Sequence, residues 1–166
     1  MPYQQIAFSQ VNTLELPTVG AGNDTSICIG SSFNLSANGA STYLWTPTAT
    51  LSDSAIANPV ATPSINTTYV VAGTDANGCT NTDTITISIN ALPIINAGND
   101  TVLCVGDTLQ LNGSGGSTYS WSPSTGISNA NIASPYLVVS ANETFTLTGT
   151  DANGCQNTDQ VTVTVN

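Results

Sequence analysis

Short segments in which β-branched or aromatic residues alternate with polar residues recur along this chain. Residues 68–72 are Thr-Tyr-Val-Val-Ala, and residues 84–89 are Thr-Ile-Thr-Ile-Ser-Ile. A period of two is typical of β-strands, and no window shows the 3.6-residue period of a helix. Between these segments, residues 75–78 are Asp-Ala-Asn-Gly, and Asn-Gly is typical of a hairpin turn. The pattern predicts an all-β fold.

The whole pattern occurs twice, with an offset of 76 residues (104 − 28 = 76). Three matched pairs show the register: Cys28 and Cys104, Trp45 and Trp121, Cys79 and Cys155. Self-similarity at a fixed period indicates a repeat architecture. We therefore divide the chain into residues 1–16, a first repeat over 17–90, a linker at 91–92 and a second repeat over 93–166.

Each repeat contains six or seven short segments of strand character. In the first repeat they lie near Val19 and at residues 25–29, 32–37, 42–45, 59–62, 68–74 and 84–89. Short antiparallel strands in this number, with a Trp on the third main strand (strand C), are typical of an immunoglobulin-like sandwich. We therefore expect two tandem immunoglobulin-like antiparallel β-sandwich domains.

Four aromatic residues are expected in the two cores. Trp45 and Trp121 occupy strand C of their repeats, where burial is the usual fate of Trp. Tyr69 lies at the start of strand F (residues 68–74), at the place of a tyrosine corner. Its counterpart, Phe145, has no hydroxyl group, so ring packing is the requirement that the two repeats share.

The charge of the chain excludes several chemistries. The 166 residues include ten acidic residues and no Lys, Arg or His, which gives a net charge of −10. Nucleic-acid binding needs a basic patch, and acid–base catalysis most often uses His. No spacing of carboxylates and hydroxyls assembles a catalytic site, and no apolar segment is long enough to span a membrane. We expect no enzyme activity, no nucleic-acid partner and no membrane insertion.

The four cysteines predict disulfides in an oxidising compartment. Pairing within each repeat would join Cys28 to Cys79 and Cys104 to Cys155. However, Cys28 and Cys79 are expected at opposite ends of a sandwich about 20 Å long, whereas the Cα atoms of a disulfide lie within about 7 Å. A bridge between repeats, from Cys28 to Cys155, would leave Cys79 and Cys104 for flanking copies. Both pairings stay open at this point.

Acidic and amide residues near the turns suggest calcium as a candidate cofactor. The residues are Asp24, Asp75 and Asn77 in the first repeat and Asp100, Asp151 and Asn153 in the second. Hard oxygen ligands are those that Ca²⁺ prefers, and each set is expected at one end of its sandwich. Asp and Asn are also ordinary turn residues. Calcium binding is therefore a hypothesis beside the turn interpretation.

Residues 1–16 do not match a complete repeat. Ile6 and Phe8, and then Leu14 and Leu16, are each spaced by two, as on one face of a strand. The segment is interpreted as the tail of a preceding repeat, or alternatively as a donor strand that completes the sheet of another subunit. No secretory signal begins at Met1, so we expect a part of a longer secreted protein.

Several motifs resemble those of a known family. They are residues 21–24 (Ala-Gly-Asn-Asp), 43–47 (Tyr-Leu-Trp-Thr-Pro), 74–79 (Thr-Asp-Ala-Asn-Gly-Cys) and 121–126 (Trp-Ser-Pro-Ser-Thr-Gly). They resemble the PKD-like, immunoglobulin-like repeats of giant surface adhesins in gliding Bacteroidota, over nearly the whole chain outside residues 1–16. The resemblance implies secretion to the cell surface and a role in adhesion or gliding motility. It implies no catalytic residues.

Three functional classes follow from these observations. The first is a structural and adhesive module that acts as a stiff extracellular spacer, with neighbouring repeats as its partners. The second is a self-associating filament subunit whose donor strand comes from residues 1–16. The third is a module that binds surface glycans, although its two Trp residues occupy core positions and leave no row of exposed aromatics.

Overall fold

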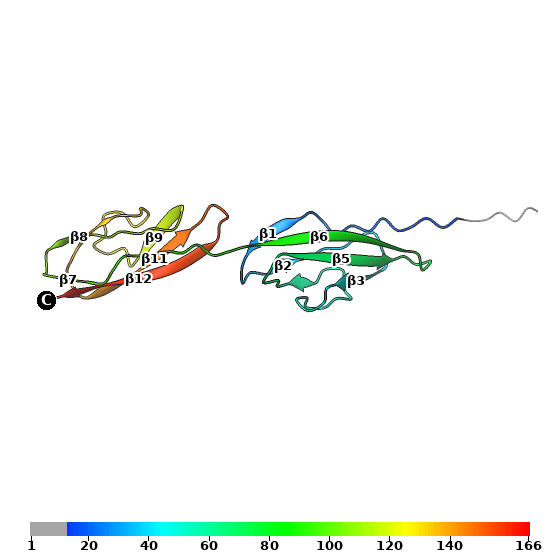
Figure 1. Cartoon of the computed structure of the whole chain (residues 1–166), viewed down its shortest axis with the longest axis horizontal. Coiled ribbons are helices and arrows are strands. Elements are labelled where there is room, and N and C mark those ends of the chain that lie inside the picture. The colour runs from blue at the N-terminus through cyan, green and yellow to red at the C-terminus, as the bar shows by residue number, and fades with distance from the viewer. Residues whose placement is uncertain (1–12) are drawn as a thin grey trace, which may run out of the picture. The chain divides into compact units, whose positions relative to one another are not determined.

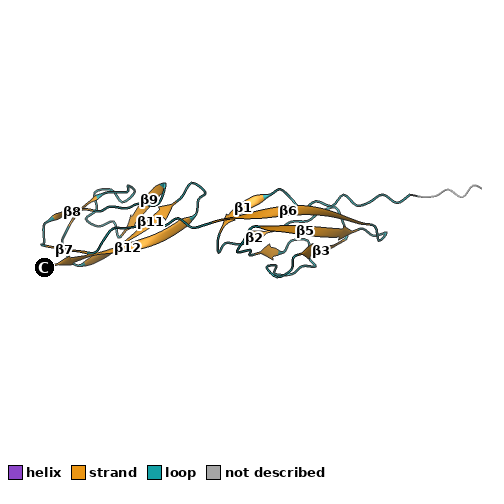
Figure 2. Ribbon diagram, viewed as in Figure 1, coloured by secondary structure: helices purple, strands orange, loops and turns teal. Residues whose placement is uncertain are grey.

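The structure is a computed structural model, and it describes residues 13–166 (Figures 1 and 2). Within this range the chain has twelve strands and no helix, and therefore no helix that could cross a membrane. The contacts divide the chain into two compact units. One comprises the described residues up to Thr25 together with Ser32–Ser88, and the other comprises Ser26–Ser31 and Ile89–Asn166.

The first repeat contains two sheets. Its strands are β1 (Thr25–Cys28), β2 (Phe33–Asn34), β3 (Thr42–Thr46), β4 (Val60–Ala61), β5 (Thr67–Thr74) and β6 (Thr80–Asn90). One sheet has the order β1-β6-β5-β3, and the other pairs β2 with β4. The β3-β5-β6 and β2-β4 pairings correspond to strands C, F and G and strands B and E of an immunoglobulin sandwich.

The second repeat has the same topology. Its strands are β7 (Thr101–Leu103), β8 (Thr108–Gln110), β9 (Thr118–Ser122), β10 (Tyr136–Val138), β11 (Glu143–Thr150) and β12 (Gln156–Val165). One sheet has the order β7-β12-β11-β9, and the other pairs β10 with β8. β7 runs parallel to β12, with Thr101 opposite Val163. The prediction of two tandem immunoglobulin-like β-sandwiches is confirmed.

The largest differences in length from the sequence-based expectation are in β2 and β6. β2 covers only Phe33–Asn34 of the expected 32–37, although Leu35 N still donates to Pro59 O at 2.9 Å. Because Pro59 has no N–H, it cannot return a ladder bond. β6 begins at Thr80, before the expected residue 84, because its hairpin with β5 keeps its register up to Thr80 opposite Thr74.

Each sandwich has its own core, built around one Trp and one further aromatic ring. Trp45 and Tyr69 are 0% exposed, and Trp121 and Phe145 are each 2% exposed. Each indole N–H donates to a backbone oxygen, from Trp45 to Ile56 at 3.1 Å and from Trp121 to the equivalent Ile132 at 3.0 Å. A buried Trp usually needs such a partner, so both cores accommodate it in the same way.

The segment before the first repeat is described only from residue 13. Leu14 and Leu16 are 59% and 64% exposed and lie in no strand. Ile6 and Phe8 lie outside the described residues, as does most of the segment interpreted as a repeat tail or donor strand. The two-residue spacing of Leu14 and Leu16 therefore does not mark a strand.

Candidate functional site

The four cysteines occupy two equivalent places in the repeats. Cys28 ends β1 and Cys104 follows β7, so each precedes the turn into the next strand. Cys79 precedes β6 and Cys155 precedes β12, so each follows the hairpin turn between the two longest strands of its sheet. The repeat thus presents one cysteine at each of two turns.

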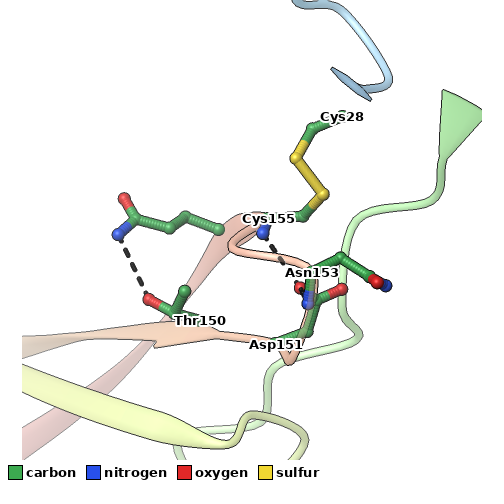
Figure 3. Close-up of a disulfide and its surroundings, with 6 residues drawn as sticks. Cys28, Thr150, Asp151, Asn153 and Cys155 are labelled. Carbon is green, nitrogen blue, oxygen red and sulfur yellow. Dashed lines mark hydrogen bonds between the residues drawn. A yellow bond between two sulfur atoms is a disulfide. The ribbon is translucent and has the colours of Figure 1, made fainter. Parts of the chain in front are cut away.

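Cys28 and Cys155 form a disulfide with their Cα atoms 5.5 Å apart (Figure 3). The bond connects positions of the two repeats, and 127 residues separate the two cysteines in the sequence. Both lie in the second compact unit, which comprises Ser26–Ser31 as well as Ile89–Asn166. Pairing within each repeat is therefore wrong for this structure, where Cys79 and Cys104 are free thiols.

The turn that presents Cys155 is organised by one carboxylate. Asp151 Oδ1 accepts hydrogen bonds from Asn153 N at 2.8 Å and from Cys155 N at 2.9 Å (Figure 3). Asp151 N in turn donates to Cys155 O at 2.9 Å. A short acidic side chain that bonds the backbone two and four residues onward fixes the turn. Cys155 consequently leaves the turn in one defined direction.

The turn that presents Cys79 has the same bonds without a disulfide. Asp75 Oδ1 accepts from Asn77 N at 2.9 Å and from Cys79 N at 2.8 Å. Asp75 N donates to Cys79 O at 3.0 Å. Local bonds therefore suffice to build the turn at Cys79, which has no disulfide. The equivalent turn at Cys155 does not need its disulfide for its shape.

The second kind of turn is also shared by the two repeats. Ser31 N donates to Cys28 O at 3.0 Å, and Asp107 N donates to Cys104 O at 3.2 Å. The intervening Gly30 and Gly106 have φ angles of 84° and 92°, which Gly adopts without steric cost. The free Cys104 thus sits in the same turn as the bonded Cys28.

The expected calcium ligands are not gathered together. Asp24 Oδ1 accepts a bond from Thr86 N at 2.8 Å, and Asp100 Oδ1 accepts one from Thr162 N at 2.7 Å. Thr86 is six residues beyond the first residue of β6, roughly 20 Å along the strand, whereas Asp75 lies in the turn before it. The expectation that Asp24 shares one end of the sandwich with Asp75 and Asn77 is therefore wrong.

The second repeat separates Asp100 from Asp151 and Asn153 in the same way, because Thr162 lies six residues after Gln156 at the start of β12. Over residues 13–166, no group of three or more His, Cys, Asp or Glu side chains could hold a metal ion. The carboxylates instead accept bonds from backbone N–H groups, which is their ordinary role in turns and strand edges.

One carboxylate in each repeat fastens the start of the domain to its last strand. Asp83 Oδ2 accepts from Ala21 N at 2.8 Å, and Asp159 Oδ2 accepts from Ala97 N at 2.8 Å. The bond from Ala21 N, followed by that from Thr84 N, lowers the pKa of Asp83 below its ordinary value, against a smaller opposing effect of burial. Sequence reasoning missed these two residues, although their recurrence at the repeat offset could have identified them.

A shallow pocket in the second sandwich has a volume of about 170 Å³. Its lining includes Asn99, Thr101, Gln110 and Asn112, and it contains no aromatic or acidic side chain. Ligand pockets usually enclose roughly 300 Å³ or more. The pocket therefore offers neither a stacking surface for a sugar nor a group for catalysis.

A scan against known protein families finds no match, and a search of curated proteins finds no significant relative. Among solved structures, the chain is similar to the first two immunoglobulin domains of DIP-gamma, with 13% identity, a TM-score of 0.39, and 91% of this chain and 98% of that chain covered. The insect immune protein hemolin gives 12% identity, a TM-score of 0.44, and coverage of 96% and 49%. Fibronectin(III)-like modules of Clostridium thermocellum CbhA give 13%, 0.40, and 89% and 94%.

Proposed function

We propose that this chain is a non-enzymatic structural and adhesive repeat module of a large cell-surface adhesin, in which it acts as an extracellular spacer. The observation that carries the proposal is the Cys28–Cys155 disulfide, which joins the turn after β1 in the first repeat to the hairpin turn before β12 in the second repeat. A disulfide that persists indicates an oxidising environment such as the cell exterior. The finer assignment to adhesion or gliding motility rests on the resemblance of the repeat motifs.

The disulfide gives such a spacer a specific mechanical property. Tension applied to the two ends of the chain passes from Cys28 directly to Cys155 through the sulfur atoms. The 127-residue sequence separation between them is thereby removed from the path of the force. At about 3.4 Å per extended residue, this segment would otherwise lengthen the chain by about 430 Å. This arrangement fits a spacer that resists lengthening under tension.

Stretching of single molecules of the full chain tests the spacer role. Under oxidising conditions we expect the maximum extension to fall short of that of the reduced chain by about 430 Å, because the disulfide spans only 5.5 Å between the two Cα atoms. Under oxidising conditions, a Cys28→Ser/Cys155→Ser chain should extend as far as the reduced parent chain. A Cys79→Ser/Cys104→Ser chain should extend only as far as the oxidised parent chain. Equal extension under the two conditions would refute the spacer role.

Two further readouts address the alternatives. Fibres whose growth depends on protein concentration, seen by electron microscopy, would favour a filament subunit over a spacer. Specific retention on a glycan array would favour a sugar-binding module. We expect monomeric scattering profiles. We also expect no glycan retention, because the Trp side chains of both repeats are buried.

A further inference from the structure

We propose that Cys79 and Cys104 each form a disulfide with a neighbouring repeat of this type, in the arrangement of the Cys28–Cys155 bond. The observed bond joins the cysteine before the first turn of one repeat to the cysteine after the hairpin turn of the next. By the same rule, Cys104 takes the hairpin cysteine of a following repeat, and Cys79 takes the first-turn cysteine of a preceding repeat. This inference rests on the repeat character that the proposed function also uses.

The local structure supports this assignment at both free cysteines. The turn around Cys79 matches the turn around the bonded Cys155, with Asp75 in the place of Asp151. The turn after Cys104 matches the one after the bonded Cys28, including the positive φ of its Gly. Each free thiol is therefore already held in the backbone setting of a cysteine that is bonded elsewhere in this structure.

Exposure separates the free cysteines from their bonded counterparts. Cys155 is 0% exposed, whereas Cys79 is intermediate. Cys104 is exposed, whereas Cys28 is half-buried. In each equivalent pair the free cysteine is the more accessible one. This is the result expected if each lacks the repeat that would cover it, and accessible thiols are those that enter thiol–disulfide exchange.

The proposed bonds would interlock successive repeats. Each bond spans 127 residues, whereas the repeat offset is 76 residues (104 − 28 = 76), so adjacent disulfide loops overlap by 51 residues (127 − 76 = 51). Every repeat inside an array would then be held covalently to the repeat before it and the repeat after it. Strain on any linker would pass to a sulfur–sulfur bond.

The chemistry requires an oxidant, which we assign to the class of low-molecular-weight or protein disulfides. A thiolate of Cys104 attacks the oxidant disulfide, forms a mixed disulfide and releases one thiol. The thiolate of the neighbouring repeat then attacks the Cys104 sulfur and releases the second thiol. Two thiols lose two protons and two electrons to the oxidant, and one disulfide forms.

An extended chain tests the inference directly. Ala-Leu and a copy of residues 17–90 are added after Asn166, which reproduces the natural linker and register. The original Cys79 is replaced (Cys79→Ser), and the Cys28 of the added copy is also changed to Ser. The four remaining cysteines then lie in four different local sequences. The control is the same chain with Cys104→Ser.

Refolding with oxidised glutathione is followed by alkylation of free thiols and digestion with pepsin, because the chain contains no Lys or Arg for trypsin. We expect two cystine peptides by mass spectrometry, Cys28 with Cys155 and Cys104 with the added copy's hairpin cysteine, and loss of both alkylatable thiols. The control should keep one alkylatable thiol, on the added copy. Recovery of the Cys28–Cys155 peptide verifies folding in both chains.

Alkylation of Cys104 and of the added cysteine in a chain that retains the Cys28–Cys155 bond would overturn the inference, as would a Cys104–Cys155 peptide. A copy of residues 93–166 followed by Ala-Leu, placed before residue 17 and with the copy's Cys155 changed to Ser, tests Cys79 independently. Its first-turn cysteine should pair with Cys79. Peptide mapping has no mechanical readout, so a negative result here is distinct from failure of the spacer role in stretching.

Discussion

Side-chain polar atoms in the two sandwiches have partners even where the repeats differ in sequence. Over residues 13–166, no buried side-chain nitrogen or oxygen lacks a hydrogen bond. In the first repeat the hydroxyl group of Tyr69 bonds that of Thr50. The equivalent residues of the second repeat are Phe145 and Gly126, so both hydroxyl groups are missing together. The tyrosine position thus keeps its ring in both cores, while the polar pair is optional.

We expect Thr50→Val to destabilise the first sandwich by about 1–2 kcal/mol, because it leaves the hydroxyl of the buried Tyr69 without its partner. Tyr69→Phe combined with Thr50→Val should recover much of this loss, since both polar groups are then removed. Hydrogen exchange of the β5 and β6 amides measures the change. Additive losses in the double variant would contradict the pairing.

The carboxylate of Asp83 predicts a pH dependence. Its pKa is lowered in the folded state by the bonds from Ala21 N and Thr84 N, so the ionised form stabilises the fold. This contribution is complete above the ordinary carboxyl pKa of about 4 and is lost as the pH falls through the lower folded value. Asp83→Asn, which can still accept a bond, should therefore flatten the acid side of the stability profile.

Melting temperatures between pH 2 and 7 provide the measurement for Asp83→Asn. The difference between the two proteins should be largest near neutral pH and should shrink toward the acid end. Thr82→Ala, a change at a neighbouring exposed position of β6, serves as the control and should leave the shape of the profile unchanged. Parallel profiles for Asp83→Asn and the parent chain would show that the carboxylate has no such role.

At the scale of the elements, each repeat closes with the start of its chain held against an early turn. Gly20 and Asn38 form an antiparallel bridge, and the equivalent Asn96 and Ser114 form another. The turn residue Gly39 has a φ of 86°, and a Cβ atom there would overlap the backbone of Thr18. Two requirements, a left-handed backbone and close packing, thus select Gly at this position.

Gly78 has the left-handed backbone of Gly39 without its close packing, so the two residues together distinguish the two requirements. Its φ of 84° is similar, but a Cβ atom there would meet no other atom. We expect Gly78→Ala to cost about 1–2 kcal/mol from backbone strain alone, and Gly39→Ala to cost at least about 2 kcal/mol more because the Thr18 backbone must also move. Urea unfolding measures both losses, and equal losses would contradict the steric contribution.

At the scale of the whole molecule, the disulfide connects two turns that would each form without it. Because it crosses neither core, its removal should leave both sandwiches folded. We expect Cys28→Ser/Cys155→Ser to increase hydrogen exchange at least several-fold in residues 26–31 and 151–155, while protection of β5 and β11 stays the same.

Cys79→Ser/Cys104→Ser is the matched control for this change, because it replaces the equivalent cysteines that carry no bond. It should alter exchange in neither region. Loss of protection in β5 or β11 in the Cys28→Ser/Cys155→Ser chain would show that the bond stabilises the sandwiches themselves. Hydrogen exchange measured by mass spectrometry after digestion with pepsin resolves all four regions.

The amino-acid sequence by itself determined the duplicated all-β organisation, because alternation, turn residues and repeat register are local or periodic signals. The burial of Trp45 and the hairpin at residues 75–78 follow from the same signals. It also limited the chemistry, since the absence of every cationic side chain is a property of composition alone.

Only the tertiary structure decided which distant groups meet. It paired Cys28 with Cys155, placed Asp24 against the backbone of Thr86 and away from Asp75, and matched Thr50 to Tyr69. Each of these contacts depends on strand register and on the packing of one turn near another, and residues far apart in sequence carry no local signal of their distance in space. The repeat could show that the cysteines are equivalent in pairs, but only the folded chain could show which of them are bonded.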